Sequence, residues 1–194
     1  MILPEHKKLI ILPERVGGGF IKDAHAEYEL PNVPYHAQFD NFRESNPDFE
    51  VGAFCRNPYT KAVSLFHWRI NDNGPGEKGR KGELAKEFGN WVSSALKNEP
   101  SCFNRINFYG RVSLDFLGKF ESLREDFKKL CEWTGINGLQ YDVSSKGSYN
   151  YNPEEYFTDK VVEDIKKYWG ACFDAFGYSE DYRDGFVVSQ QKTL

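Results

Sequence analysis

Short runs of apolar residues alternate along this chain with segments of helical spacing. Apolar, β-favouring residues occupy 9–12, 49–55 and 112–120, and each run ends at turn residues or at a change of period. These three segments are predicted to be strands. Because each strand is followed by an amphipathic segment, the pattern favours an α/β architecture with a parallel sheet and helices on its faces.

The helical segments carry recognisable start and stop signals. Asn57 is placed to cap a helix whose first turn contains Pro58. The polar, glycine-rich stretch from Asn71 to Gly82 predicts a loop, and Gly177 marks the end of the last helix. Helices are predicted at residues 21–28, at 58–70, from 84 onward, in the segment that follows the third strand through 121–123, and at 158–176.

Composition fits one compact domain. The chain has 194 residues, of which 40% are hydrophobic, and it shows no internal repeat, so a single domain over 1–194 is predicted. The net charge of −4 argues against general nucleic-acid binding, although a local basic pocket for a small polyanion is compatible with it.

The first residues of the chain indicate where the protein is located. Charged residues interrupt the first apolar run well before the length of a signal peptide or a membrane span, which predicts a cytoplasmic protein without a membrane span.

The four cysteines are scattered without CxxC spacing, so we expect buried thiols rather than disulfides or a metal site. They are Cys55, Cys102, Cys131 and Cys172.

A glycine-rich loop follows the first predicted strand. The strand stops at Pro13, and Gly17, Gly18 and Gly19 then lead into a helix. Glycines allow a sharp turn and close backbone approach, and the start of a helix favours negative charge. The expected ligand is therefore an anion such as phosphate, although the loop is neither GxxxxGK[ST] nor GxGxxG.

Three further residues stand where they suit such a ligand. Arg56 follows the second strand, at the carboxyl end where open α/β sheets bind ligands. Ser64 lies two turns along the next helix. His36 lies in the connection after the first helix, from which an imidazole can approach a ligand on the glycine loop.

Three segments of the chain resemble one protein family. FCRNPYTKAVSLFHWRI, at 54–70, resembles the RNPYxRxVSxY element of carbohydrate-type sulfotransferases. DFLGKFESLREDFKKLCEWTGI, at 115–136, is similar to the family's DFIGRYENLxxDFxxxCxxLGI element, and the pattern at 156–178 resembles its C-terminal signature.

The resemblance implies a fold, a donor and an acceptor. The fold would be three-layered and P-loop-like, with a central, mainly parallel sheet flanked by helices. The reaction would move a sulfuryl group from 3′-phosphoadenosine-5′-phosphosulfate (PAPS) to a hydroxyl of a carbohydrate, a glycolipid or a small metabolite, without a metal. Arg56 and Ser64 would bind the 3′-phosphate, and Lys146 lies in a loop of the region that closes over the nucleotide.

The glycine loop departs from the family pattern, which reads like PKTGGTS or KTAGTS where this chain has PERVGGGF. One register aligns Glu14 with the family's lysine. A shift by one residue places Arg15 there, and we favour this register because it keeps Ile21 at the first buried helix position. The residues predicted to contact the 5′-phosphosulfate are then Arg15, Val16, Gly17, Gly18, Gly19 and Phe20.

Sulfuryl transfer also needs a base for the acceptor hydroxyl. His36 is the predicted base, with Asp40 and Glu44 as alternatives, and Arg15 is predicted to stabilise the leaving oxygen. Two other interpretations stay open. One is a catalytically degenerate relative that binds a nucleotide or a partner. The other is a P-loop phosphotransferase, which the missing GK[ST] disfavours.

Overall fold

A computed structural model describes residues 2–13, 15–18, 21, 45–72, 81–98, 114–136 and 152–186. By their internal contacts, the residues form two compact units. Unit 1 comprises 1–55 and 111–146, and unit 2 comprises 56–110 and 147–194. The single domain expected from the sequence stays a prediction, and each unit is described by itself below.

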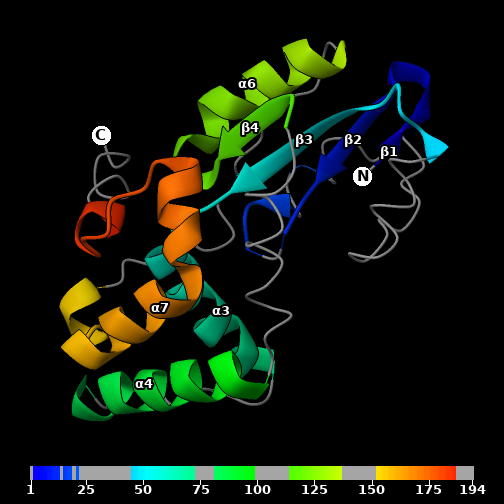
Figure 1. Ribbon diagram of the computed structural model, residues 1–194. Helices are drawn as coiled ribbons and strands as arrows, with labels where there is room; N and C mark the ends of the chain where they lie inside the picture. Colours follow the sequence, from blue (N-terminus) through cyan, green and yellow to red (C-terminus); the bar gives the residue numbers. More distant parts are fainter. Residues whose placement is uncertain are drawn as a thin grey trace. The chain divides into compact units, whose positions relative to one another are not determined.

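Unit 1 is built on a mainly parallel sheet (Figure 1). In the described residues its strand order is β1-β2-β3-β4, with β2 and β3 parallel, β3 and β4 parallel, and β1 antiparallel to β2. The predicted α/β class with a mainly parallel sheet is therefore confirmed. The strands are β1 (Ile2–Leu3), β2 (Lys8–Ile11), β3 (Glu50–Cys55) and β4 (Phe116–Lys119).

The strands match the predicted ones with two corrections. The third predicted strand, 112–120, is shorter than expected, because β4 ends at Lys119 and Phe120 begins a 3₁₀ turn. Asp115 comes just before β4, and its side chain accepts a hydrogen bond from Val51 N at 2.8 Å. The short strand β1 was missed, since its two residues form a strand only through pairing with β2.

The core of unit 1 lies between the sheet and α6 (Leu123–Thr134). Residues 51–55 of β3 are all buried, as expected for a parallel strand covered on both faces. Helix α6 packs against β4. The buried apolar cluster consists of Leu3, Ile10, Val16, Ile21, Phe54, Phe127, Leu130 and Ile136.

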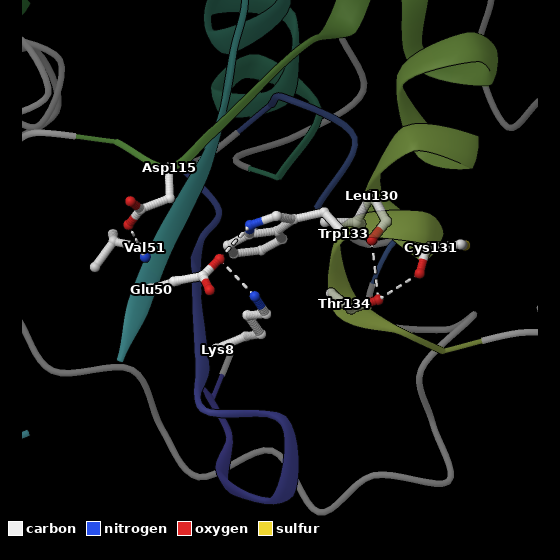
Figure 2. A network of polar contacts seen from close by, with 8 residues as sticks. All are labelled: Lys8, Glu50, Val51, Asp115, Leu130, Cys131, Trp133 and Thr134. Atoms are coloured by element: carbon white, nitrogen blue, oxygen red, sulfur yellow. Dashed lines mark hydrogen bonds and ion pairs between the residues drawn. The ribbon is translucent and has the colours of Figure 1, made fainter. Parts of the chain in front are cut away.

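A polar contact ties β2, β3 and α6 together, as Figure 2 shows. The Glu50 carboxylate accepts hydrogen bonds from Lys8 Nζ at 2.5 Å and from Trp133 Nε1 at 2.8 Å. Lys8 Nζ also lies 4.7 Å from the centroid of the Trp133 ring. The hydrogen bond from Lys8 lowers the pKa of Glu50, so the carboxylate is charged at neutral pH.

The buried carboxylate of Asp126 forms hydrogen bonds with residues at the junction between β4 and α6. Asp126 accepts hydrogen bonds from Ser122 Oγ at 2.7 Å, from Lys129 Nζ at 2.7 Å and from Lys119 N at 2.8 Å. Burial alone would raise the pKa of Asp126, but these hydrogen bonds outweigh it and hold the pKa below its usual value. Asp126 is thus a structural carboxylate.

Unit 2 contains α3 (Pro58–Asp72), α4 (Lys81–Asn98) and α7 (Asp159–Phe176), shown in Figure 1. The predicted loop from Asn71 to Gly82 is wrong at both ends. Asn71 and Asp72 continue α3, and Lys81 and Gly82 begin α4, because the strongest breakers of the stretch, Gly74 and Pro75, fall between the helices. Residues 73–80 lie outside the described residues.

The core of unit 2 is aromatic. The Phe88 ring packs edge-on against Phe66 and Tyr156, with centroids 5.3 Å and 5.5 Å apart. Helix α7 begins as predicted, with Thr158 Oγ1 accepting a hydrogen bond from Val161 N at 3.4 Å, and ends before Gly177 at a φ of 63°. Helix α7 and the 3₁₀ turn at Pro153–Glu155 both pack on α4.

Of the three described cysteines, two are buried as expected. Cys55 and Cys172 are buried thiols, Cys131 is a partly buried thiol, and Cys102 lies outside the described residues. In the part of the chain that the structure describes, His, Cys, Asp and Glu side chains form no group of three that could hold a metal ion. None of the described helices has the length and apolar character needed to cross a membrane.

Candidate functional site

The glycine loop of unit 1 leads from β2 into a helical turn. Arg15 and Gly17 adopt left-handed backbone conformations, with φ values of 63° and 85°. Gly17 O accepts a hydrogen bond from Ile21 N at 3.1 Å, so helical bonding starts at Gly17. Val16 and Ile21 are fully buried and anchor the loop. The predicted strand and glycine loop are present, whereas residues 22–28 of the predicted helix lie outside the described residues.

The glycines at 17 and 18 have a packing role of their own. A Cβ atom on Gly17 would lie 2.8 Å from Leu123 Cδ2, closer than side chains approach one another. On Gly18 it would lie 3.3 Å from Leu12 Cβ. The φ of 85° favours glycine at position 17, and a side chain at position 17 or 18 would require Leu123 or Leu12 to shift, whether or not an anion binds to the loop.

Several predicted site residues lie outside the described residues. Of the two candidates for the loop cation position, Arg15 is described and partly buried, whereas Glu14 is not described. Which of the two faces an anion stays a prediction. The other predicted residues outside the described ranges are Gly19, Phe20, His36, Asp40, Glu44 and Lys146.

In unit 2 the start of α3 is capped as predicted. Asn57 Oδ1 accepts hydrogen bonds from Tyr59 N at 2.9 Å and from Thr60 N at 3.4 Å. Asn57 O accepts from Lys61 N at 2.9 Å, and the Asn57 side chain is buried. Pro58 stands at the first helical position, where no N–H is needed. The cap thus satisfies backbone donors that an unbonded helix start would leave open.

Arg56 is held against this capped helix. Arg56 Nε donates a hydrogen bond to Thr60 Oγ1 at 3.1 Å, and Thr60 Oγ1 donates to Asn57 O at 3.2 Å. Arg56 is partly exposed, whereas Thr60 and Ser64 are buried. Because Thr60 and Ser64 are four residues apart, they lie on one face of α3. A guanidinium group can bind a phosphate through two parallel N–H···O hydrogen bonds.

Thr60 is the residue of this arrangement that sequence reasoning missed. The available signal was its spacing, four residues after Arg56 and three after the capping Asn57. A threonine at this distance can accept from an arginine at the helix start while it donates to a carbonyl of the previous turn.

The segment after α7 packs on the start of α3 within unit 2. A Cβ atom on Gly185 would lie 2.8 Å from Asn57 Oδ1. Tyr59 Oη donates a hydrogen bond to Glu180 O at 2.9 Å, and burial raises the pKa of Tyr59, as do the nearby charges of Glu180 and Asp181. Tyr59 therefore stays a neutral donor at any physiological pH.

Fold and connectivity define an α/β protein whose glycine loop follows β2 and whose Arg56 directly follows β3. No family model matches the chain, and no solved structure matches it. A stretch of 107 residues, 52% of the chain, is 32% identical to an uncharacterized protein of Archaeoglobus fulgidus and covers 81% of that protein. The chain belongs to the same family as this archaeal protein.

Proposed function

We propose that the protein is a sulfotransferase that moves a sulfuryl group from PAPS to a hydroxyl acceptor, either a carbohydrate, a glycolipid or a small metabolite. The observation that carries the proposal is the contact between Arg56 and Thr60 at the capped start of α3. It lies within the segment RNPYTKAVS, which resembles the family's 3′-phosphate element.

Arg56 and Ser64 are the proposed ligands of the 3′-phosphate. A guanidinium can bind two phosphate oxygens at once, and a hydroxyl adds a further donor. Asn57 already accepts from the amides of Tyr59 and Thr60. The phosphate would therefore be bound here by side chains rather than by these helix amides.

The loop that contains Arg15, Gly17 and Gly18 is the proposed cradle of the 5′-phosphosulfate. Its turn and helix start suit binding through backbone N–H groups. The Arg15 guanidinium would neutralise the charge that develops on the leaving phosphate oxygen. Lys146, which is not described, is proposed to bind the nucleotide as well.

His36 is the proposed base. In the reaction, the imidazole takes the proton of the acceptor hydroxyl, and the acceptor oxygen forms a new bond to sulfur. The bond between sulfur and the bridging oxygen of the 5′-phosphate breaks, and its electron pair stays on that oxygen. The products are the sulfated acceptor and adenosine 3′,5′-bisphosphate.

A second function, nucleotide binding without transfer, is favoured by one feature. The loop PERVGGGF has no lysine, and it carries Glu14 next to Arg15. A carboxylate beside a multiply charged anion would be repelled. In this interpretation the protein would bind adenosine 3′,5′-bisphosphate but would not turn over PAPS.

The test is an incubation with ³⁵S-labelled PAPS and a panel of sugars, glycolipids and small alcohols. The proposed function predicts a labelled product and the release of adenosine 3′,5′-bisphosphate that depend on an acceptor. Binding of the bisphosphate without transfer to any acceptor would favour the second function. Absence of both binding and transfer would reject the two together.

A further inference from the structure

We infer that Thr60 is a positioning residue, which holds the Arg56 guanidinium in the orientation that receives the 3′-phosphate. The inference rests on the proposed function, since it deepens the role of Arg56 in nucleotide binding. It starts from a chain of two hydrogen bonds: Arg56 Nε to Thr60 Oγ1 at 3.1 Å, and Thr60 Oγ1 to Asn57 O at 3.2 Å.

The direction of the two bonds is fixed by the chemistry of the hydroxyl. A threonine hydroxyl has one proton and two lone pairs. Because Asn57 O can only accept, the Thr60 proton points to Asn57 O. The lone pairs are then left for the Nε–H of Arg56, and an arginine can only donate. The geometry therefore assigns Thr60 as the acceptor for Arg56.

The anchor is itself held firmly. Thr60 is 8% exposed and Asn57 is 2% exposed. Asn57 is fixed by accepting the amides of Tyr59 and Thr60, and Gly185 packs against its side chain. The hydroxyl thus presents its lone pair from a fixed point rather than from a mobile surface side chain.

The bond involves Nε, which lies at the inner end of the guanidinium group. A hydrogen bond at Nε sets the plane and the direction of the guanidinium group, and this bond does not use either terminal nitrogen. Ordering a long side chain in advance lowers the entropic cost of binding a ligand. Thr60 would therefore act on the nucleotide through Arg56, without touching the nucleotide.

Two variants at position 60 separate orientation from packing. Thr60→Val keeps the shape of the side chain but removes the acceptor, whereas Thr60→Ser keeps the hydroxyl and removes the methyl group. Thr134→Val is the matched control. Thr134 is also a buried helical threonine that donates to backbone carbonyls, those of Leu130 and Cys131, in unit 1.

The experiment has two readouts. NMR of arginine-labelled protein follows hydrogen exchange of the Arg56 Nε–H, with the signal assigned by Arg56→Lys. Calorimetric titration measures affinity for adenosine 3′,5′-bisphosphate and for adenosine 5′-monophosphate, which lacks the 3′-phosphate. Thr60→Val should speed exchange and weaken bisphosphate binding about three- to tenfold, the range for ordering one long side chain. Affinity for the monophosphate should stay the same, and Thr60→Ser and Thr134→Val should resemble the wild type.

The outcomes separate the inference from the proposed function. If the wild type binds the bisphosphate and Thr60→Val binds it equally well with unchanged Nε–H exchange, Thr60 does not position Arg56. Equal losses for both nucleotides would also overturn the inference, because they indicate a general structural defect. If the wild type does not bind the bisphosphate, the proposed function fails, and the role of Thr60 in binding fails with it.

Discussion

The side chain of Asn57 lies directly against the backbone of Gly185. A Cβ atom at position 185 would lie 2.8 Å from Asn57 Cγ and Oδ1, and 2.9 Å from Nδ2. Asn57 Oδ1 is the atom that caps α3. The segment after α7 is therefore packed so closely on the α3 cap that it leaves no room for a side chain.

This contact predicts that Gly185→Ala destabilises the protein. The new methyl group must displace the Asn57 side chain, which weakens the cap, and a loss of about 1–3 kcal/mol in the free energy of unfolding is expected. The matched control is Gly170→Ala, since a Cβ atom on Gly170 in α7 meets nothing within 4 Å. That variant should be stabilised by roughly 0.5–1 kcal/mol. Denaturant unfolding checks both, and equal destabilisation of the two variants would contradict the packing argument.

The burial of His67 leads us to predict that the folded protein loses stability in mild acid. Its imidazole is hydrogen-bonded to Tyr156 Oη at 2.8 Å, and burial lowers the pKa of His67 from the usual 6.5. The unfolded chain therefore binds a proton at a higher pH than the folded protein does. Stability from the neutral imidazole is fully present above pH 6.5 and is lost as the pH falls through the folded pKa.

The measurement is the free energy of unfolding between about pH 7.5 and pH 5, for the wild type and His67→Gln. The wild type should lose more stability than the variant over this range, because only the wild type has the titrating imidazole. Parallel curves for the two proteins would show that His67 does not contribute to the pH dependence.

The register that places Arg15 at the family's lysine position predicts different effects on nucleotide affinity when Arg15 and Glu14 are each replaced. Arg15→Ala should weaken binding of adenosine 3′,5′-bisphosphate by about 1.5–3 kcal/mol and lower any transfer rate further, since it removes a charge-assisted contact. Glu14→Ala should leave binding unchanged or improve it slightly, because it removes a negative charge. Affinities are compared at fixed salt concentration, with thermal melts to show that both variants fold. The reverse result would exclude Arg15 as the phosphosulfate contact.

Gly18 is expected to allow close approach of the phosphosulfate to the backbone, so Gly18→Val should block nucleotide binding. The contact between Gly18 and Leu12 Cβ makes a folding control necessary. Gly18→Ala adds only the Cβ atom and serves as that control. A folded Gly18→Val variant with wild-type affinity would remove this glycine from the cradle.

If His36 is the base, removing its imidazole should lower the transfer rate without weakening nucleotide binding. His36→Ala should lower the transfer rate by roughly 10²–10⁴-fold while nucleotide affinity stays within about twofold. Single-turnover kinetics with PAPS and an accepted hydroxyl substrate measure the first, and titration measures the second. Wild-type turnover in the variant would place the base elsewhere, and Asp40 and Glu44 would be tested next.

Local signals in the sequence were sufficient for several elements. Asn57 followed by Pro58, and Thr158 with Gly177, mark helix ends through residues close together in the chain, and the structure has these ends. Caps depend on one side chain and the next two or three amides, so their pattern is visible without a fold.

Long-range contacts were not accessible in the same way. Glu50 meets Lys8 and Trp133 across 42 and 83 residues of sequence, and no local pattern indicates such a contact. Strand β1 exists only through its pairing with β2. Asp126 lies in a helical pattern that also suits an exposed acid, and its burial follows from three donors that the fold brings to it.

The measurement that tests the central proposal most directly is a calorimetric titration of the wild type and Arg56→Ala with adenosine 3′,5′-bisphosphate. A charge-assisted phosphate contact is worth about 1.5–3 kcal/mol, which corresponds to a loss of about ten- to a hundredfold in affinity. We expect the wild type to bind and the variant to lose affinity in this range, with a melting temperature close to that of the wild type. Absence of binding by the wild type, or equal affinity of the two proteins, would contradict the account.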